Sequence, residues 1–239
     1  MLKIENVEVL GWEHVIRGMR NPKNSWGRSD SFFWDAGSSI NEAWGIEKTV
    51  DDFGTEVHIG PNDYTLMKSL AEGGPVHAKY RRMITVYLDI TAPLYWWKEF
   101  DTYKVGTVAN SCSTMHKIHS KEFTLEDFST EHLFTRSFDD IVEVIDDLNY
   151  WRDIYLNSGM SDNRDGTCRV HEKHDKDVWW QMIQLLPSSY NQKRTVMLNY
   201  EVLANIYQWR RNHKLDEWHV VCDWIESLPY SELITGEKE

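Results

Sequence analysis

Small polar residues gather between residues 104 and 115, in the sequence KVGTVANSCSTM. The stretch holds two serines, two threonines, an asparagine, a cysteine and a glycine. It follows a segment with a strand pattern and an aromatic helical segment. Backbone N–H groups and hydroxyls in such a loop are well suited to contact an anionic ligand. The sequence therefore predicts a binding loop here.

Two further groups of side chains could hold a metal ion. One is the pair His116 and His119, and the other combines Cys168, His171 and His174. Neither group has the four-ligand spacing of a structural zinc site. We therefore expect no metal, and we expect these residues to lie on the surface.

His77 and Lys79 stand between a helix stop at residues 73–75 and the next strand, a position that can meet a ligand. On the local sequence alone, a hydrogen bond from His77 to the neighbouring loop is the first interpretation. Asn199 and Asn205 fall on a predicted helix over residues 195–212, offset by roughly 120° around its axis. Amides on an apolar helix need partners, and a ligand rich in hydrogen-bonding groups is one such partner.

A central strand must position these groups. Residues 84–90 alternate apolar Ile84, Val86, Leu88 and Ile90 with more polar neighbours, which is the period of a half-buried strand. Residues 91–93, Thr-Ala-Pro, are expected to stop the strand and lead into an aromatic helix over residues 94–103.

The other expected elements follow from the same periodicities. Residues 2–10 predict a strand and residues 12–19 a short helix. An ordinary surface loop is the preferred interpretation of residues 25–41, and a cover over an active site or interface is the alternative. Asn62 or Asp63 is expected to cap the next helix. Further helices are predicted over residues 138–156, 176–186, 195–212 and 215–228, with an exposed polar loop over 158–176 and a frayed tail after Pro229.

Composition limits the function classes. The chain has 239 residues and no repeat or linker, so we expect one domain over residues 1–239. Its net charge of −12 argues against non-specific nucleic-acid binding. Three widely spaced cysteines favour a reducing compartment, and no apolar segment is long enough to span a membrane. A cytoplasmic protein with no membrane contact is expected, and its twelve Trp and eleven Tyr residues suit cores, subunit interfaces and stacking on flat ligands.

Residues 63–228 resemble the flavin-dependent thymidylate synthases. The shared order is a helix, a His-containing loop, a strand ending Ala-Pro, an aromatic helix and a Ser/Asn-rich loop. The best-matching segment is residues 185–210, LLPSSYNQKRTVMLNYEVLANIYQWR, which aligns without a gap on the family pattern Leu-Pro…Asn-x-Arg-x-Leu-x-x-Asn/His-Phe…Arg.

The resemblance implies an α/β (α+β) fold, a twisted, mostly antiparallel sheet flanked by helices, assembled as a homotetramer with sites at subunit interfaces. It also implies methylation of dUMP at carbon 5 with methylenetetrahydrofolate, FAD and NADPH, a reaction in which the protein supplies no nucleophile. The family positions that bind the cofactor correspond to His77, Lys79, Asn199, Asn205 and Arg210. Those that bind the nucleotide correspond to Glu99, Lys104, Asn110, Ser111, Cys112, Ser113 and Arg210.

The chain also departs from the family. Of the signature Arg-His-Arg triplet only Lys104 keeps a charge, while Glu201 and Ile183 occupy positions where the family has arginines. Each lost guanidinium contact costs about 1.5–3 kcal/mol if nothing replaces it. The candidate replacements are Lys79, Lys104, Lys117, Arg210 and Arg211.

Three hypotheses remain. The first is a divergent flavin-dependent thymidylate synthase of the kind carried by a phage. The second is a related flavoenzyme that modifies another pyrimidine nucleotide. The third is a non-catalytic homologue that keeps the tetramer.

Overall fold

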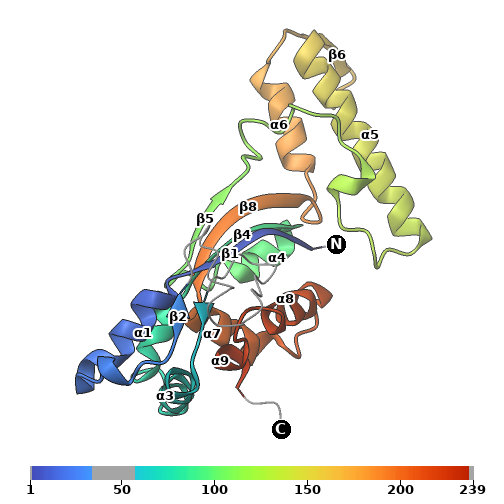
Figure 1. Ribbon diagram of the computed structural model, residues 1–239. Coiled ribbons are helices and arrows are strands. Elements are labelled where there is room, and N and C mark those ends of the chain that lie inside the picture. The colour runs from blue at the N-terminus through green and yellow to red at the C-terminus, as the bar shows by residue number, and fades with distance from the viewer. Residues whose placement is uncertain (1, 34–56, 237–239) are drawn as a thin grey trace, which may run out of the picture. The chain divides into compact units, whose positions relative to one another are not determined.

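The computed structural model describes residues 2–33 and 57–236 (Figure 1). It is a mixed α/β structure with two compact units. Unit 1 consists mainly of residues 91–100 and 111–194, and unit 2 consists of residues 4–90, 101–110 and 195–239. The expectation of one domain over the whole chain stays a prediction.

A four-stranded sheet, with the strand order β1-β4-β8-β5, has most of its residues in unit 2. The inner strand β4, together with the residue before it, carries the alternating apolar residues Ile84, Val86, Leu88 and Ile90, all exposed by 2% or less, which confirms the predicted strand. The strand extends through Pro93 instead of stopping at residue 91, and helix α4 (Leu94–Phe100) begins at the next residue. The four strands are β1 (Lys3–Leu10), β4 (Thr85–Pro93), β5 (Val108–Ser111) and β8 (Asn191–Asn199).

Helices complete unit 2. The helices α7 (Tyr200–Arg210), α8 (Asp216–Glu226) and α9 (Glu232–Thr235) pack on one another. Trp218, Val221, Cys222 and Ile225 of α8 are buried, as their spacing predicts. The remaining elements are α1 (Trp12–Arg20), α3 (Pro61–Glu72), the 3-10 helices η1 (Asn21–Lys23), η2 (Trp26–Arg28) and η3 (Ala78–Met83), and the paired strands β2 (Phe32–Phe33) and β3 (Val57–His58).

The start of α3 differs from the prediction because neither Asn62 nor Asp63 caps it. Gly60 is the N-cap residue, and the carboxylate of Asp30 accepts hydrogen bonds from the backbone N–H groups of Asn62 (2.9 Å) and Asp63 (3.2 Å). A side chain at residue 60 would collide with Asp30, since an added Cβ would lie 2.3 Å from it. Glycine is therefore required where the two segments meet.

Asp63 itself is fully buried and ties α1 to the segment before β2. Its Oδ1 accepts from Nε of Arg20 at 2.6 Å. Its Oδ2 accepts from the hydroxyls of Ser29 and Ser31 and from the backbone N–H groups of Asp30 and Ser31, at 2.6–3.2 Å. Burial alone would raise the pKa of Asp63, but the hydrogen bonds from the two serine hydroxyls and from Arg20 outweigh it and hold the pKa below its usual value.

The predicted helix over residues 195–212 is wrong in its first five residues, which end strand β8. Val196 and Leu198 are buried and alternate with more exposed neighbours, as a strand requires. Asn199 has the extended backbone of an N-cap (φ −140°, ψ 169°), and the helix begins at Tyr200. Asn199 therefore precedes the helix that carries Asn205.

Unit 1 contains α4 (Leu94–Phe100), α5 (Thr135–Asn157) and α6 (Lys176–Leu185), together with the 3-10 helix η4 (Leu125–Asp127). Helices α5 and α6 lie side by side in Figure 1. Ile141, Ile145 and Leu148 of α5 are buried with Met182 of α6, which confirms the pattern predicted over residues 138–156. The helix predicted over residues 176–186 is also present.

The polar segment 158–176 is not simply the exposed loop that its composition suggests. It forms an antiparallel hairpin of β6 (Gly159–Asp162) and β7 (Cys168–His171). His171, expected on the surface, is only 5% exposed. Its Nε2 lies 2.8 Å from Oγ of Ser161, and its Nδ1 lies 2.8 Å from Oδ2 of Asp175, the N-cap residue of α6. The imidazole thus joins the hairpin to the start of α6.

The tail also differs from the prediction. After Pro229 the chain forms α9, in which Leu233 and Ile234 are 1% and 5% exposed. The hydroxyl of Tyr230 accepts a hydrogen bond from the backbone N–H of Ile59, which fixes this end of the chain to unit 2. No helix within residues 2–33 and 57–236 is long and apolar enough to cross a membrane.

Candidate functional site

The junction of β8 and α7 brings two of the predicted site segments together. Oδ1 of Asn199 accepts hydrogen bonds from the backbone N–H groups of Glu201 and Val202, both at 3.1 Å. Its Nδ2 donates to the carbonyl of Gly106 at 3.5 Å, so the turn that follows Lys104 rests against the first turn of α7. Gly106 has φ +81°, and an added Cβ would lie 2.9 Å from Nδ2 of Asn199. Only glycine permits this approach.

Three buried polar atoms belong to residues in or beside this first turn, and none has a hydrogen-bond partner among the described residues. They are Nε of Arg81, Oε2 of Glu201 and Oγ1 of Thr107. Arg81 Nη1 lies 3.9 Å from the same Glu201 oxygen, and the two side chains are 15% and 14% exposed. Buried polar groups are nearly always hydrogen-bonded. This group is therefore suited to a polar ligand that supplies the missing bonds.

Tyr80 lies beside this group. Burial raises its pKa to about 12, against the opposing effect of the neighbouring Arg81 guanidinium. The phenol therefore keeps its proton at neutral pH and donates it to the carbonyl of Met67 at 3.0 Å. Tyr80 thereby holds η3, which carries Arg81, against α3.

Arg210 is fixed between aromatic rings. Its Nε donates to the hydroxyl of Tyr103 at 3.0 Å. Its guanidinium carbon lies 4.9 Å from the ring centroid of Trp218 and 5.7 Å from that of Tyr103. This cation–π packing sets the position of the charge at the end of α7. Arg211, considered as a replacement cation, instead forms salt bridges with Asp223 and Glu226.

The other predicted site residues of unit 2 are exposed. This holds for His77, Lys79, Lys104, Asn110 and Asn205. The backbone N–H of His77 donates to the carbonyl of Gly74 at 2.9 Å, and its ring packs against Gly73. Asn205 lies on the exposed side of α7, the helix that Asn199 caps and that ends at Arg210.

The remaining predicted residues belong to unit 1. Glu99 is half-buried on α4, and Ser111, Cys112 and Ser113 are exposed. The backbone of Cys112 is fixed, because its N–H donates to the carbonyl of Lys193 and its carbonyl accepts from Nε2 of Gln192. The hydroxyl of Ser113 accepts from the backbone N–H of His116 at 2.9 Å. No cluster of metal-binding side chains occurs among the described residues.

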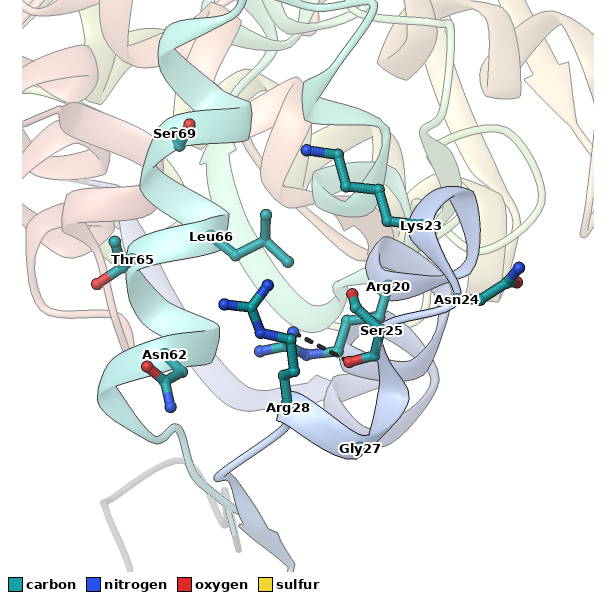
Figure 2. Close-up of a pocket in the computed structure, with 10 residues that line it drawn as sticks. All are labelled: Arg20, Lys23, Asn24, Ser25, Gly27, Arg28, Asn62, Thr65, Leu66 and Ser69. Carbon is teal, nitrogen blue, oxygen red and sulfur yellow. Dashed lines mark hydrogen bonds between the residues drawn. The ribbon is translucent and has the colours of Figure 1, made fainter.

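A basic cavity of about 780 Å³ lies in unit 2 between α3 and the turns after α1 (Figure 2). No prediction from the sequence pointed to it. The signal was present, since Lys23 and Arg28 stand in a turn-rich segment and small polar residues recur on α3 at 62, 65 and 69. Its lining residues are Arg20, Lys23, Asn24, Ser25, Gly27, Arg28, Asn62, Thr65, Leu66 and Ser69.

Solved structures of one enzyme share this fold. The chain is similar to thymidylate synthase X from Helicobacter pylori, solved with FAD and dUMP, with a TM-score of 0.59 at 12% identity over 98% of both chains. A second structure of that enzyme, also with FAD and dUMP, gives a TM-score of 0.58 at 12% identity over 96% of this chain and 98% of the other. No protein-family model and no curated protein sequence matches the chain. The likeness shows that the chain has the fold of a flavin-dependent thymidylate synthase over nearly its whole length.

Proposed function

We propose that the protein is a flavin-dependent thymidylate synthase-like enzyme that methylates dUMP at carbon 5, using methylenetetrahydrofolate, FAD and NADPH. The observation that carries the proposal is the full-length fold match to structures that hold FAD and dUMP. The sequence resemblance over residues 63–228 is independent support, because it rests on motifs and not on the fold. The homotetramer and the cytoplasmic location implied by the resemblance belong to the same proposal.

The chemistry of the described residues fits a flavin nucleotide near the first turn of α7. The unpartnered atoms of Arg81, Thr107 and Glu201 supply donors and acceptors for such a polar ligand. Arg81 could replace the arginine that the family has at the position of Glu201. The guanidinium of Arg81 lies beside Glu201, although Arg81 belongs to η3 and not to α7. Bound FAD would supply the hydride that reduces the transferred carbon, and NADPH would restore it.

The protein's own tasks in this proposal are positioning and charge. Asn199 holds the turn at Gly106 against α7, and Arg210 offers a fixed cation at the other end of the helix. His77, Lys79 and Asn205 are the exposed candidates for further cofactor contacts. The candidates for contacts with the nucleotide substrate are Glu99, Lys104, Asn110, Ser111, Cys112 and Ser113. Fixed side chains such as Asn199 and Arg210 act by holding the reacting groups in place.

Glu201 favours a second candidate function, the modification of a cytosine nucleotide. A carboxylate accepts a hydrogen bond from the amino group at carbon 4 of cytosine, whereas uracil has a carbonyl oxygen at that position, which a carboxylate would repel. Oε2 of Glu201 is buried and has no hydrogen-bond partner among the described residues. A dCMP-directed flavoenzyme would use that acceptor.

The first test is the absorption spectrum of the purified protein after FAD is added and the excess is removed. We expect flavin bands to remain, with Arg81→Gln reducing the retained flavin or the nucleotide affinity. Arg82→Gln is the matched control, since Arg82 is the next residue and is exposed. Retained flavin with conversion of dUMP supports the synthase, and conversion of dCMP alone supports the second candidate. Failure to retain flavin at any concentration contradicts both.

A further inference from the structure

We propose that the basic cavity of Figure 2 binds the phosphate group of a nucleotide-sized ligand. The proposal rests on the cavity itself and does not require the proposed enzymatic function.

The cavity carries positive charge on a strongly acidic chain. Three of its lining residues are cations and none is an acid, although the chain has a net charge of −12. Arg20 is neutralised by Asp63, so the net charge comes from Lys23 and Arg28. Among the described residues, no carboxylate forms a salt bridge with either of these two. Figure 2 shows both side chains directed across the cavity toward α3. They are therefore available to an anion.

The frame around these cations is rigid. Arg20 is 4% exposed, and besides its bond to Asp63 it donates from Nη1 to the carbonyl of Ser25 at 3.3 Å. Asp63 in turn accepts from Ser29 and Ser31. The turns that carry Lys23 and Arg28 thus begin and end on a buried network. A preorganised site loses less entropy when it binds.

The opposite wall supplies neutral groups for the rest of a nucleotide. Asn62, Thr65 and Ser69 follow one another along α3 at spacings of three and four residues, which places them on one face. Leu66 adds an apolar surface between them. A wall of hydroxyl and amide groups around an apolar contact suits a sugar and base, and about 780 Å³ lies within the range of small-molecule sites.

The test measures binding of inorganic pyrophosphate, ADP, dUMP and FAD separately to the full-length protein by calorimetry. The variant Lys23→Gln/Arg28→Gln removes both cations, and Ser69→Glu adds a carboxylate to the cavity while leaving the cations in place. Arg17→Gln/Arg82→Gln is the matched control, since both arginines are exposed in the same unit and lie outside the cavity. Urea unfolding of each variant checks the fold.

We expect the dissociation constant of at least one phosphate compound to rise tenfold or more in both cavity variants, and to change less than twofold in the control. The compound whose dissociation constant rises in both cavity variants identifies the source of the phosphate, and this rise is called its response. A response of FAD or dUMP assigns the cavity to the proposed cofactor or substrate, and a response of ADP or pyrophosphate alone makes it a separate site. Equal affinities in wild type and both cavity variants overturn the proposal, as does the absence of binding of all four compounds to the wild type. Either result leaves flavin retention and turnover as a separate question.

Discussion

Replacement of Asp63 by Asn should be one of the most destabilising single changes in unit 2. The two side chains have the same shape, so the change removes charge and acceptor capacity without opening a cavity. One amide orientation places N–H donors against Nε of Arg20 and leaves a buried cation without its partner. The other orientation places the amide N–H donors against the four donors of residues 29–31, which then lose their acceptor. Neither orientation satisfies the site.

The magnitude follows from the cost of breaking a buried ion pair, about 3–5 kcal/mol. That is a large part of the total stability of a typical domain, about 5–15 kcal/mol. With a urea m-value of about 3 kcal/mol/M, the unfolding midpoint should fall by roughly 1–2 M at constant m. The lowered pKa of Asp63 adds a pH signature. Its stabilisation is fully present above the ordinary carboxyl value and is lost as the pH falls through the lowered pKa, a loss that Asp63→Asn should not show.

The assay is urea unfolding followed by circular dichroism, with Glu8→Gln as the control because Glu8 is exposed on β1 of the same unit. The control should change stability by less than about 0.5 kcal/mol. A double-mutant cycle with Arg20→Gln should give a coupling energy of about 0.5–3 kcal/mol. If Asp63→Asn behaved like Glu8→Gln, the ion pair would not be the element that holds α3 to α1.

Three further changes test other parts of the structure. Gly106→Ala should destabilise more than Gly166→Ala in thermal unfolding: both have positive φ, but only Gly106 would gain a clash with Asn199; equal losses would show that backbone strain alone matters. Met182→Ala should cost about 2–5 kcal/mol in urea unfolding because Met182 is fully buried, and an effect under 1 kcal/mol would mean that α5 and α6 do not share a core. Burial, with the neighbouring His174, Lys117 and Arg152, lowers the pKa of His119, so stability should fall as pH drops below about 6.5. His119→Gln should reduce that slope in unfolding measured from pH 7 to 5, and an unchanged slope would assign the loss to other groups.

The spacing of apolar residues correctly predicted those strands and helices whose buried face can be read from their own sequence. The strand at residues 84–90 and helices α5, α6 and α8 have patterns that the fold uses directly. The boundary at Asn199 was misplaced because Val196 and Leu203 also fit one helical stripe, and only the cap geometry separates strand from helix. The hairpin of β6 and β7 was missed because its composition is polar and its buried members, Ser161 and His171, satisfy each other.

The candidate site shows the same division between local and long-range information. The N-cap role of Asn199 is a local effect, whereas its contact with Gly106 joins residues 93 positions apart. Arg81 beside Glu201 could not be paired from spacing, because η3 and α7 meet only in the folded chain. The basic cavity likewise requires that residues after α1 face α3, which the Arg20–Asp63 pair across 43 positions determines.

The reciprocal bonds between Asp30 and the start of α3 bear on how this chain tolerates changes in length. Residues 30–33 and 57–63 are joined by those bonds and by the pairing of Phe32 with His58 and Phe33 with Val57. The two ends of segment 34–56 are therefore held together by residues outside it. Loop closure costs only about 0.6 kcal/mol for each doubling of length. A change in the number of residues between Phe33 and Val57 should therefore cost little at the two paired ends themselves, because the contacts that fix those ends lie within residues 30–33 and 57–63.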